Sequence, residues 1–416
     1  MCYLLLAVTP ATAKVPITEP GHATSLSGSM ENLVDSKRSL SLIDVLTGPA
    51  SKQFEKLPGF VNRGYMDGAT WTRFTYATPV NGSTNWYLRL VPAILDDVRV
   101  YVQVGEDPAS PASYSEYQLG DHFPMAGRSI RHLDMVVPLP AAVTTHRTVY
   151  IRVVTTSTHN LQGWLYTNEE LISWSGTYAL FSGLTLGILL VIVLINAFSA
   201  VIARSALFAW YSLLVLCVFI RQIGVDGILL ALWPKGGAHH INDVLVGGGV
   251  SMVLSTYSLF AISLFATRND RPLIRRYLQT NILVGVLTVL SIPFGWYGHL
   301  APIMVTCALL LSFVAPLLAL AQARRKEPGS WLLLSGFAVG FVGVIPRCLS
   351  ALGIAPSTWL TINAYILGAL AQAVVMTLAL VQRLHLSQQQ LLEITRRAEI
   401  HASRTGRTRI RTFRME

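Results

Sequence analysis

Charged residues are scarce in this 416-residue sequence: 13% of its residues are Asp, Glu, Lys or Arg, whereas 52% are hydrophobic. Soluble domains usually carry about 25% charged residues, so the composition argues against a single soluble enzyme. Cysteine is also scarce, and none of the four cysteines falls between residues 14 and 175. This absence excludes a disulfide, a cysteine-based zinc site and a cysteine nucleophile from that part of the chain.

Common catalytic and cofactor motifs are missing as well. There is no nucleophile elbow and no H-E-x-x-H, and the glycines at 247–249 lack the flanking strand and the Lys-Ser/Thr of a phosphate loop. The adjacent His239 and His240 point apart and have no third ligand at helical spacing. We therefore expect no catalytic residue, no metal site and no cofactor, and we do not expect this chain to be an enzyme.

Long apolar runs dominate the second half of the chain. Thr177–Val201 contains no charged residue and is long enough to cross a hydrocarbon core of about 30 Å. Six further runs of this kind predict a seven-helix transmembrane domain over residues 177–382. They lie at about 206–226, 244–266, 273–293, 299–322, 330–352 and 358–382.

The net charge of +10 fits a membrane orientation better than a nucleic-acid partner, so we expect no nucleic acid. Basic residues lie mainly in alternate short loops, for example at Arg204 and at 324–326, and after residue 382. Such residues mark the cytoplasmic side. The first half of the chain should then be periplasmic and the C-terminal end cytoplasmic, in a bacterial inner membrane. Residues 1–13 have the apolar core and the Ala-Thr-Ala ending of a signal peptide, although a basic start is missing and an uncleaved apolar stub is the alternative.

Residues 30–170 change to short runs in which every second residue is apolar. In 97–104 the valines share one face while Arg99, Tyr101 and Gln103 share the other. Further strands are expected at 71–77, 86–90, 130–138, 149–153 and 162–167. About seven or eight strands of this length predict an all-β, jelly-roll-like sandwich, which would be the extracytoplasmic sensor domain.

Three of these strands carry an aromatic residue and an arginine on the side away from the core. Aromatic rings stack on sugar faces and arginine binds carboxylates or phosphates. Such a face would bind a carbohydrate or another small or anionic ligand; the alternative is cross-strand packing. The candidate ligand-binding residues are Tyr87, Arg89, Arg99, Tyr101, Tyr150 and Arg152.

The order of several short motifs resembles a known family. Asn85-Trp-Tyr-Leu-Arg-Leu90, Gly120-Asp-His-Phe-Pro124 and Val149-Tyr-Ile-Arg-Val153 resemble the type-two extracellular domain of bacterial seven-transmembrane receptors with diverse intracellular signalling modules. Gly183-x-x-x-Gly187 and Gly224-x-Asp-Gly227 resemble parts of that family's membrane domain. The resemblance implies a periplasmic sensor, a seven-helix relay and a cytoplasmic histidine kinase or diguanylate cyclase.

The end of the sequence departs from that pattern, since the residues after 382 are too few for either catalytic domain. Apolar residues at heptad spacing predict a cytoplasmic coiled-coil stalk over 383–402, with an amphipathic helix on the membrane surface as the alternative. The Arg- and Thr-rich residues 403–416 are expected to form a basic, disordered tail near anionic membrane lipid. A homodimer or a partner signalling protein, or a gene that has lost its output domain, would account for the short end.

Ionisable residues near the outer ends of the predicted helices are the candidate relay. Arg221, Asp226, Asp243 and Arg347 would form an outer ion-pair cluster if they converge; the alternative is separate structural pairs or contacts with the membrane interface. The sequence thus favours a transmembrane signalling receptor. The alternatives are a transporter or membrane subunit of a complex with an accessory sandwich, and an interaction protein without enzymatic output.

Overall fold

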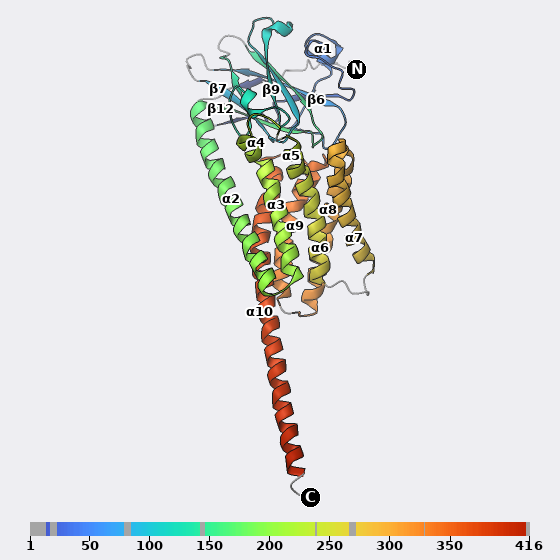
Figure 1. Cartoon of the computed structure of the whole chain (residues 1–416). Helices are drawn as coiled ribbons and strands as arrows, with labels where there is room; N and C mark the ends of the chain where they lie inside the picture. The colour runs from blue at the N-terminus through green and yellow to red at the C-terminus, as the bar shows by residue number, and fades with distance from the viewer. Residues whose placement is uncertain are drawn as a thin grey trace, which may run out of the picture.

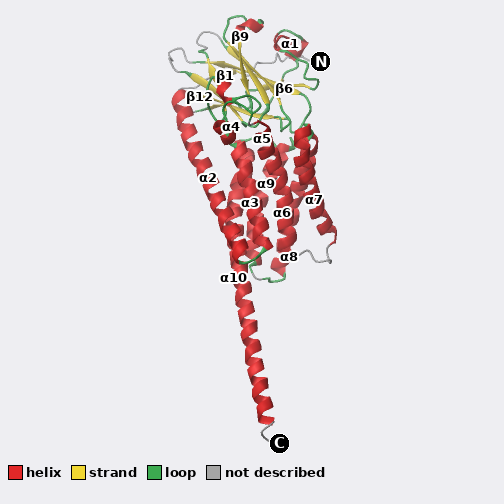
Figure 2. Cartoon of the chain, in the orientation of Figure 1, coloured by secondary structure: helices red, strands yellow, loops and turns green. Residues whose placement is uncertain are grey.

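A computed structural model describes residues 14–16, 23–78, 85–141, 146–237, 239–265, 272–327 and 329–412. A β-sandwich lies on one end of a helical bundle, and the last helix continues far beyond the other end (Figure 1). Strands are confined to the first part, and long helices to the second (Figure 2). The expected architecture, an all-β sandwich followed by seven apolar helices, is confirmed. The predicted signal peptide at 1–13 lies outside the described residues.

Two sheets form the sandwich, and their jelly-roll character stays a prediction. The larger sheet has the order β4-β3-β6-β11-β8-β9, with β1 paired to β6; the smaller has the order β10-β7-β12-β2, with β5 paired to β12. The larger sheet comprises β1 (Lys14–Pro16), β3 (Glu31–Asp35), β4 (Glu55–Lys56), β6 (Ala69–Ala77), β8 (Asp97–Gln103), β9 (Tyr114–Leu119) and β11 (Arg147–Val154). The smaller comprises β2 (Thr24–Ser25), β5 (Val61–Asn62), β7 (Trp86–Val91), β10 (Met135–Leu139) and β12 (Asn160–Thr167).

Alternation along the strands builds the sandwich core. Val98, Val100 and Val102 of β8 are fully buried, as are Leu88 and Leu90 of β7 in the facing sheet, as the period of two predicts. The strand expected at 130–138 begins only at 135. The residues before it form a polar loop instead, whose conformation is held by hydrogen bonds from the Arg128 guanidinium to the carbonyls of Gly120 and His132.

Seven of the described helices are long and apolar enough to cross a membrane. They are α2 (Asn168–Ile202), α3 (Ala206–Val225), α5 (His239–Asp243) continued through a π-helical turn into α6 (Gly249–Phe265), α7 (Pro272–Ser291), α8 (Tyr297–Arg324), α9 (Ser330–Ala351) and α10 (Trp359–Thr412). Two short helices, α1 (Leu42–Leu46) and α4 (Ile228–Leu232), lie outside this set.

Both ends of the membrane domain differ from the expected bounds. Helix α2 begins directly after β12, because Thr167 and Glu170 form a capping box there. At the other end α10 is one helix of 54 residues that runs through 383–412. A helix therefore occupies 403–412, where a disordered tail was expected, and the predicted stalk is its middle part. Residues 413–416 lie outside the described residues.

Candidate functional site

The six candidate ligand-binding residues of the sandwich do not share one face. Tyr150 and Arg152 of β11 lie beside Tyr101 and Arg99 of β8 on the larger sheet. Tyr87 and Arg89 are in β7 of the smaller sheet, paired with β12. The expectation of a single aromatic and basic face is therefore wrong, because the sequence pattern did not reveal which strands share a sheet. Their role in binding a ligand stays a prediction.

On the larger sheet the aromatic rings are packed against neighbours. Tyr101 stacks on Trp71 with ring centroids 5.9 Å apart, and Tyr150 makes edge contacts with Phe54 and Tyr114. Burial raises the pKa of both the Tyr101 and the Tyr150 hydroxyl. Cross-strand and cross-element packing, the alternative weighed above, accounts for these two rings.

Arginine side chains remain accessible beside those rings. Arg99 forms ion pairs with Asp97, at 3.2 Å, and with Glu116, at 3.6 Å, and its side chain keeps 36% of its exposure. Arg152, its neighbour across the strands, is half-buried. A guanidinium that is both exposed and adjacent to aromatic rings suits a polar ligand at the edge of this face.

Arg89 on the smaller sheet connects the sandwich to the membrane helices. Its buried guanidinium donates a hydrogen bond to Asp134 at 2.7 Å and lies 3.3 Å from the ring centroid of Trp174 on α2. The aromatic partner was missed because Trp174 precedes the uncharged run used to define the first span. Arg89 is therefore held within the fold by an ion pair and a cation–π contact.

The four candidate relay residues do not form one cluster. Asp226 and Asp243 have different partners, whereas Arg221 and Arg347 line the same cavity. Asp226 accepts hydrogen bonds from Tyr178 and Ser182 on α2 and from Gln222 on α3. Asp243 faces the sandwich and lies 3.3 Å from His122 Nε2. Within the described ranges no ion pair joins any two of Arg221, Asp226, Asp243 and Arg347. The expected ion-pair cluster is wrong, because each acid is turned toward a different neighbour.

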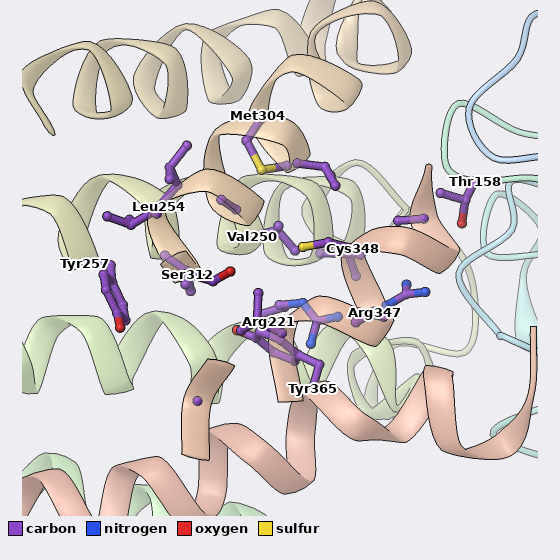
Figure 3. Close-up of a pocket in the computed structure, with 18 of the residues that line it drawn as sticks. Thr158, Arg221, Val250, Leu254, Tyr257, Met304, Ser312, Arg347, Cys348 and Tyr365 are labelled. Atoms are coloured by element: carbon purple, nitrogen blue, oxygen red, sulfur yellow. The ribbon is translucent and has the colours of Figure 1, made fainter. Parts of the chain in front are cut away.

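Arg221 and Arg347 line one cavity of about 150 Å³ inside the outer half of the bundle. In the close-up view both arginines lie with Tyr365 on one side, whereas Val250, Leu254 and Met304 lie on the other (Figure 3). The sandwich covers its outer end with the side chains of Tyr65, Ile94, Ser157 and Thr158. The cavity is thus built by both domains.

A polar cluster lies at the junction of the two domains. Asn242 donates a hydrogen bond to Asp121 at 3.0 Å, and His122 pairs with Asp243. Burial raises the pKa of Asp121 to about 7, and the hydrogen bond to Asp243 raises the pKa of His122 to about 9. This cluster couples the charge state of a sandwich loop to the start of the third membrane span.

Asp121 and His122 of this cluster, together with Asp96, have the geometry to hold a metal ion. One ligand atom from each of Asp96, Asp121 and His122 lies within 4.8 Å of the others. Asp96 is already engaged, because both its oxygens accept hydrogen bonds from Thr155 or Thr156. No metal site was expected here, because Asp96 is distant in sequence from Asp121 and His122 and the three residues form no local motif.

Comparison with known families decides the identity of the two domains. The model of the family described as "7TMR-DISM extracellular 2" matches residues 27–167, and the model described as "7TM diverse intracellular signalling" matches residues 178–383. The chain belongs to this receptor family. A 7TMR-DISM protein is a multi-pass membrane receptor with an extracellular sensor domain, and here the sensor is the sandwich. A search of the curated proteins finds no match to the chain.

Proposed function

We propose that this 7TMR-DISM chain is a bacterial inner-membrane receptor that senses a periplasmic ligand through its sandwich. The ligand changes how the sandwich docks on the helices. The change then passes along α10 to a cytoplasmic kinase or cyclase, or to a partner that carries one. The distribution of basic loops supports the orientation, with the sandwich in the periplasm and the end of α10 in the cytoplasm.

One structural relationship carries this proposal: strand β12 is connected to two membrane helices at once. Its C-terminal end continues into α2 without a linker. At its other end, Gln162 donates a 2.7 Å hydrogen bond to Ser357, which in turn donates to Asn160 at 2.7 Å. Ser357 lies two residues before α10 begins. Any displacement of β12 therefore acts on α2 and on α10 together.

The adjacent strand strengthens the link to α10. Asn62 of β5 donates hydrogen bonds to the carbonyl of Ser350 in the last turn of α9, at 2.9 Å, and to the carbonyl of Ala355 in the connection between α9 and α10, at 2.7 Å. Deeper in the bundle, Asn196 of α2 donates to the Thr377 hydroxyl of α10 at 3.0 Å. Signalling through these contacts requires two helix arrangements that differ in their affinity for the ligand.

For the ligand we propose a carbohydrate or another small anionic molecule, bound near Arg99 and Tyr101. The accessible guanidinium beside stacked rings supports this class. The test is binding of full-length protein in nanodiscs to a panel of neutral and acidic oligosaccharides. Replacing Arg99 and Tyr101 with Ala should abolish binding, whereas Tyr101→Phe, which keeps the ring, should retain it. Equal binding by the double variant would exclude this face.

The relay is tested separately from the ligand. Spin labels at Ser199 on α2 and His385 on α10 report the distance between these helices in nanodiscs. Replacing Asn62, Asn160 and Gln162 with Ala removes the described side-chain hydrogen bonds between these strands and the segment before α10, so the distance distribution should shift or broaden. A matched control is Ser51→Ala, which removes a side-chain hydrogen bond within the sandwich. An unchanged distribution in the triple variant would contradict the relay.

A further inference from the structure

The cavity beneath the sandwich is lined by two cations that form no ion pair with any acid among the described residues. Arg221 keeps only 7% of its exposure, and its Nε has no hydrogen-bond partner among the described residues. Its remaining contacts are weak: a 3.5 Å contact to Gln222 Oε1 and the ring of Tyr365 at 4.7 Å. Across the described ranges, Arg347 has neither an ion pair nor a hydrogen bond from its side chain. Two like charges thus line one cavity within the apolar part of the bundle.

This arrangement is unfavourable unless an anion is present. A buried charge without a counter-ion is costly, and two guanidinium groups facing the same space repel each other. Asp226, which directly follows α3, interacts electrostatically with Arg221, but its carboxylate is bound by Tyr178, Ser182 and Gln222. Among the described residues, no carboxylate forms an ion pair with Arg221 or Arg347.

The rest of the cavity wall indicates that the anion also carries an apolar group. Opposite the arginines the wall is apolar, with Val250 and Leu254 from α6 and Met304 from α8 (Figure 3). A free inorganic anion would leave this surface without a partner, whereas an alkyl chain would cover it. The volume of about 150 Å³ suits one short chain, since an apolar cavity of about this size in another protein accepts a benzene-sized molecule.

We infer that this cavity binds a single-chain anionic amphiphile, with its carboxylate between Arg221 and Arg347 and its chain against the apolar wall. Arginine forks bind a carboxylate through several charge-assisted hydrogen bonds. The inference goes beyond the proposed function, because it places a ligand site in the membrane half whatever the sandwich binds. It also gives that site a route to the output, since Tyr365 of α10 and Thr158 of the sandwich both line the cavity.

Hexanoate is the probe, and hexanol is its neutral match. Full-length protein in phosphatidylcholine nanodiscs should bind hexanoate saturably and bind hexanol at least about tenfold more weakly, because only the carboxylate engages both arginines. Arg221→Gln or Arg347→Gln should weaken hexanoate binding by about tenfold or more without changing hexanol binding. Arg204→Gln, at the opposite membrane surface, is the matched control and should bind as the wild type does.

Two further measurements keep the inference falsifiable. Met304→Trp fills the apolar side and leaves both arginines in place, so it should reduce hexanoate binding even if an arginine variant misfolds. Native mass spectrometry with added phosphatidylglycerol shows whether a free carboxylate or a lipid headgroup is the anion. Binding of phosphatidylglycerol in place of hexanoate would overturn the single-chain assignment, and equal hexanoate binding by wild type and the Arg221, Arg347 double Gln variant would overturn the site.

Discussion

Asn242, near the start of the third membrane span, donates a 3.0 Å hydrogen bond to the carboxylate of Asp121 in a sandwich loop. Both side chains are buried, with exposures of 0% and 3%, although 121 positions separate them in the sequence. The other carboxylate oxygen of Asp121 and the amide oxygen of the Asn242 side chain have no hydrogen-bond partner among the described residues. The contact between this sandwich loop and the bundle thus includes a buried carboxylate, that of Asp121, with few hydrogen-bond donors around it.

Replacing Asn242 with Ala should loosen this junction. Asp121 would lose its donor and remain buried, at a cost of about 1–3 kcal/mol. We expect faster hydrogen exchange at residues 119–123, measured by mass spectrometry in nanodiscs. Asn196→Ala, which removes a hydrogen bond between α2 and α10, should leave exchange at 119–123 unchanged. Equal protection in the Asn242 variant and the wild type would show that other contacts hold the loop.

Replacing Arg89 with Ala should destabilise the connection between the sandwich and α2. The substitution leaves Asp134 buried without its cation and removes the cation–π contact with Trp174, which should cost about 3–5 kcal/mol. Thermal unfolding in detergent is the measurement. Asp134→Asn combined with Arg89→Leu should recover part of the loss, because both buried charges are then removed. No recovery would mean that the Trp174 contact dominates.

His159 makes the stability of the sandwich depend on pH. Its ring is 1% exposed, and burial lowers its pKa to about 4 from the ordinary value of 6.5. As the pH falls, His159 takes up a proton in the unfolded chain before it does so in the folded chain. The free energy of unfolding that depends on neutral His159 is therefore fully present above about pH 6.5 and is lost as the pH falls toward 4. The loss should reach about 3 kcal/mol.

The check is a pH series of unfolding midpoints for the wild type and for His159→Gln. Asp96 acts to raise the His159 pKa and Arg38 acts to lower it, so both should be kept unchanged. The slope between pH 6.5 and 4 should be smaller in the variant. Parallel slopes would assign the acid sensitivity to other groups.

Gly343 permits the close approach of α9 and α10. A Cβ atom there would lie 2.7 Å from both the Ala364 carbonyl oxygen and the Gly368 Cα, which are backbone atoms that cannot rotate away. Gly343→Ala should therefore separate the helices and cost about 1–3 kcal/mol in thermal unfolding. Gly183→Ala on α2 is the matched control: a Cβ there meets nothing within 4 Å, so it should be neutral or stabilise by up to about 1 kcal/mol.

Much of the fold could be predicted because hydrophobic periodicity is a local signal. Runs without charge located the seven spans to within a few residues, except at the start of α2 and the end of α10. The first turns of α2 contain Glu169 and Glu170, so they fall outside a run without charge, and they are stabilised by the Thr167 capping box and by burial of Leu171. Similarly, the helix over 403–412 has no apolar pattern that would indicate it.

The candidate site could be predicted only in part, because its geometry depends on which distant segments meet. Arg221 and Arg347 are recognisable in the sequence as charged residues within apolar runs, but their common cavity follows from the packing of α3 against the other helices. Alternation identified outward residues such as Tyr87 and Tyr101, yet it contains no information on sheet membership. The pairing of His122 with Asp243 likewise spans two domains and has no local signature.

The continuity of α10 gives the molecule a lever. The part of the helix beyond Arg383 is about 44 Å long at 1.5 Å rise per residue. A tilt of about 5° at the membrane surface would therefore carry its far end sideways by about 4 Å. Because Tyr365 belongs to the same rod, a small repacking beside the cavity would be geometrically amplified at the distant end without any hinge.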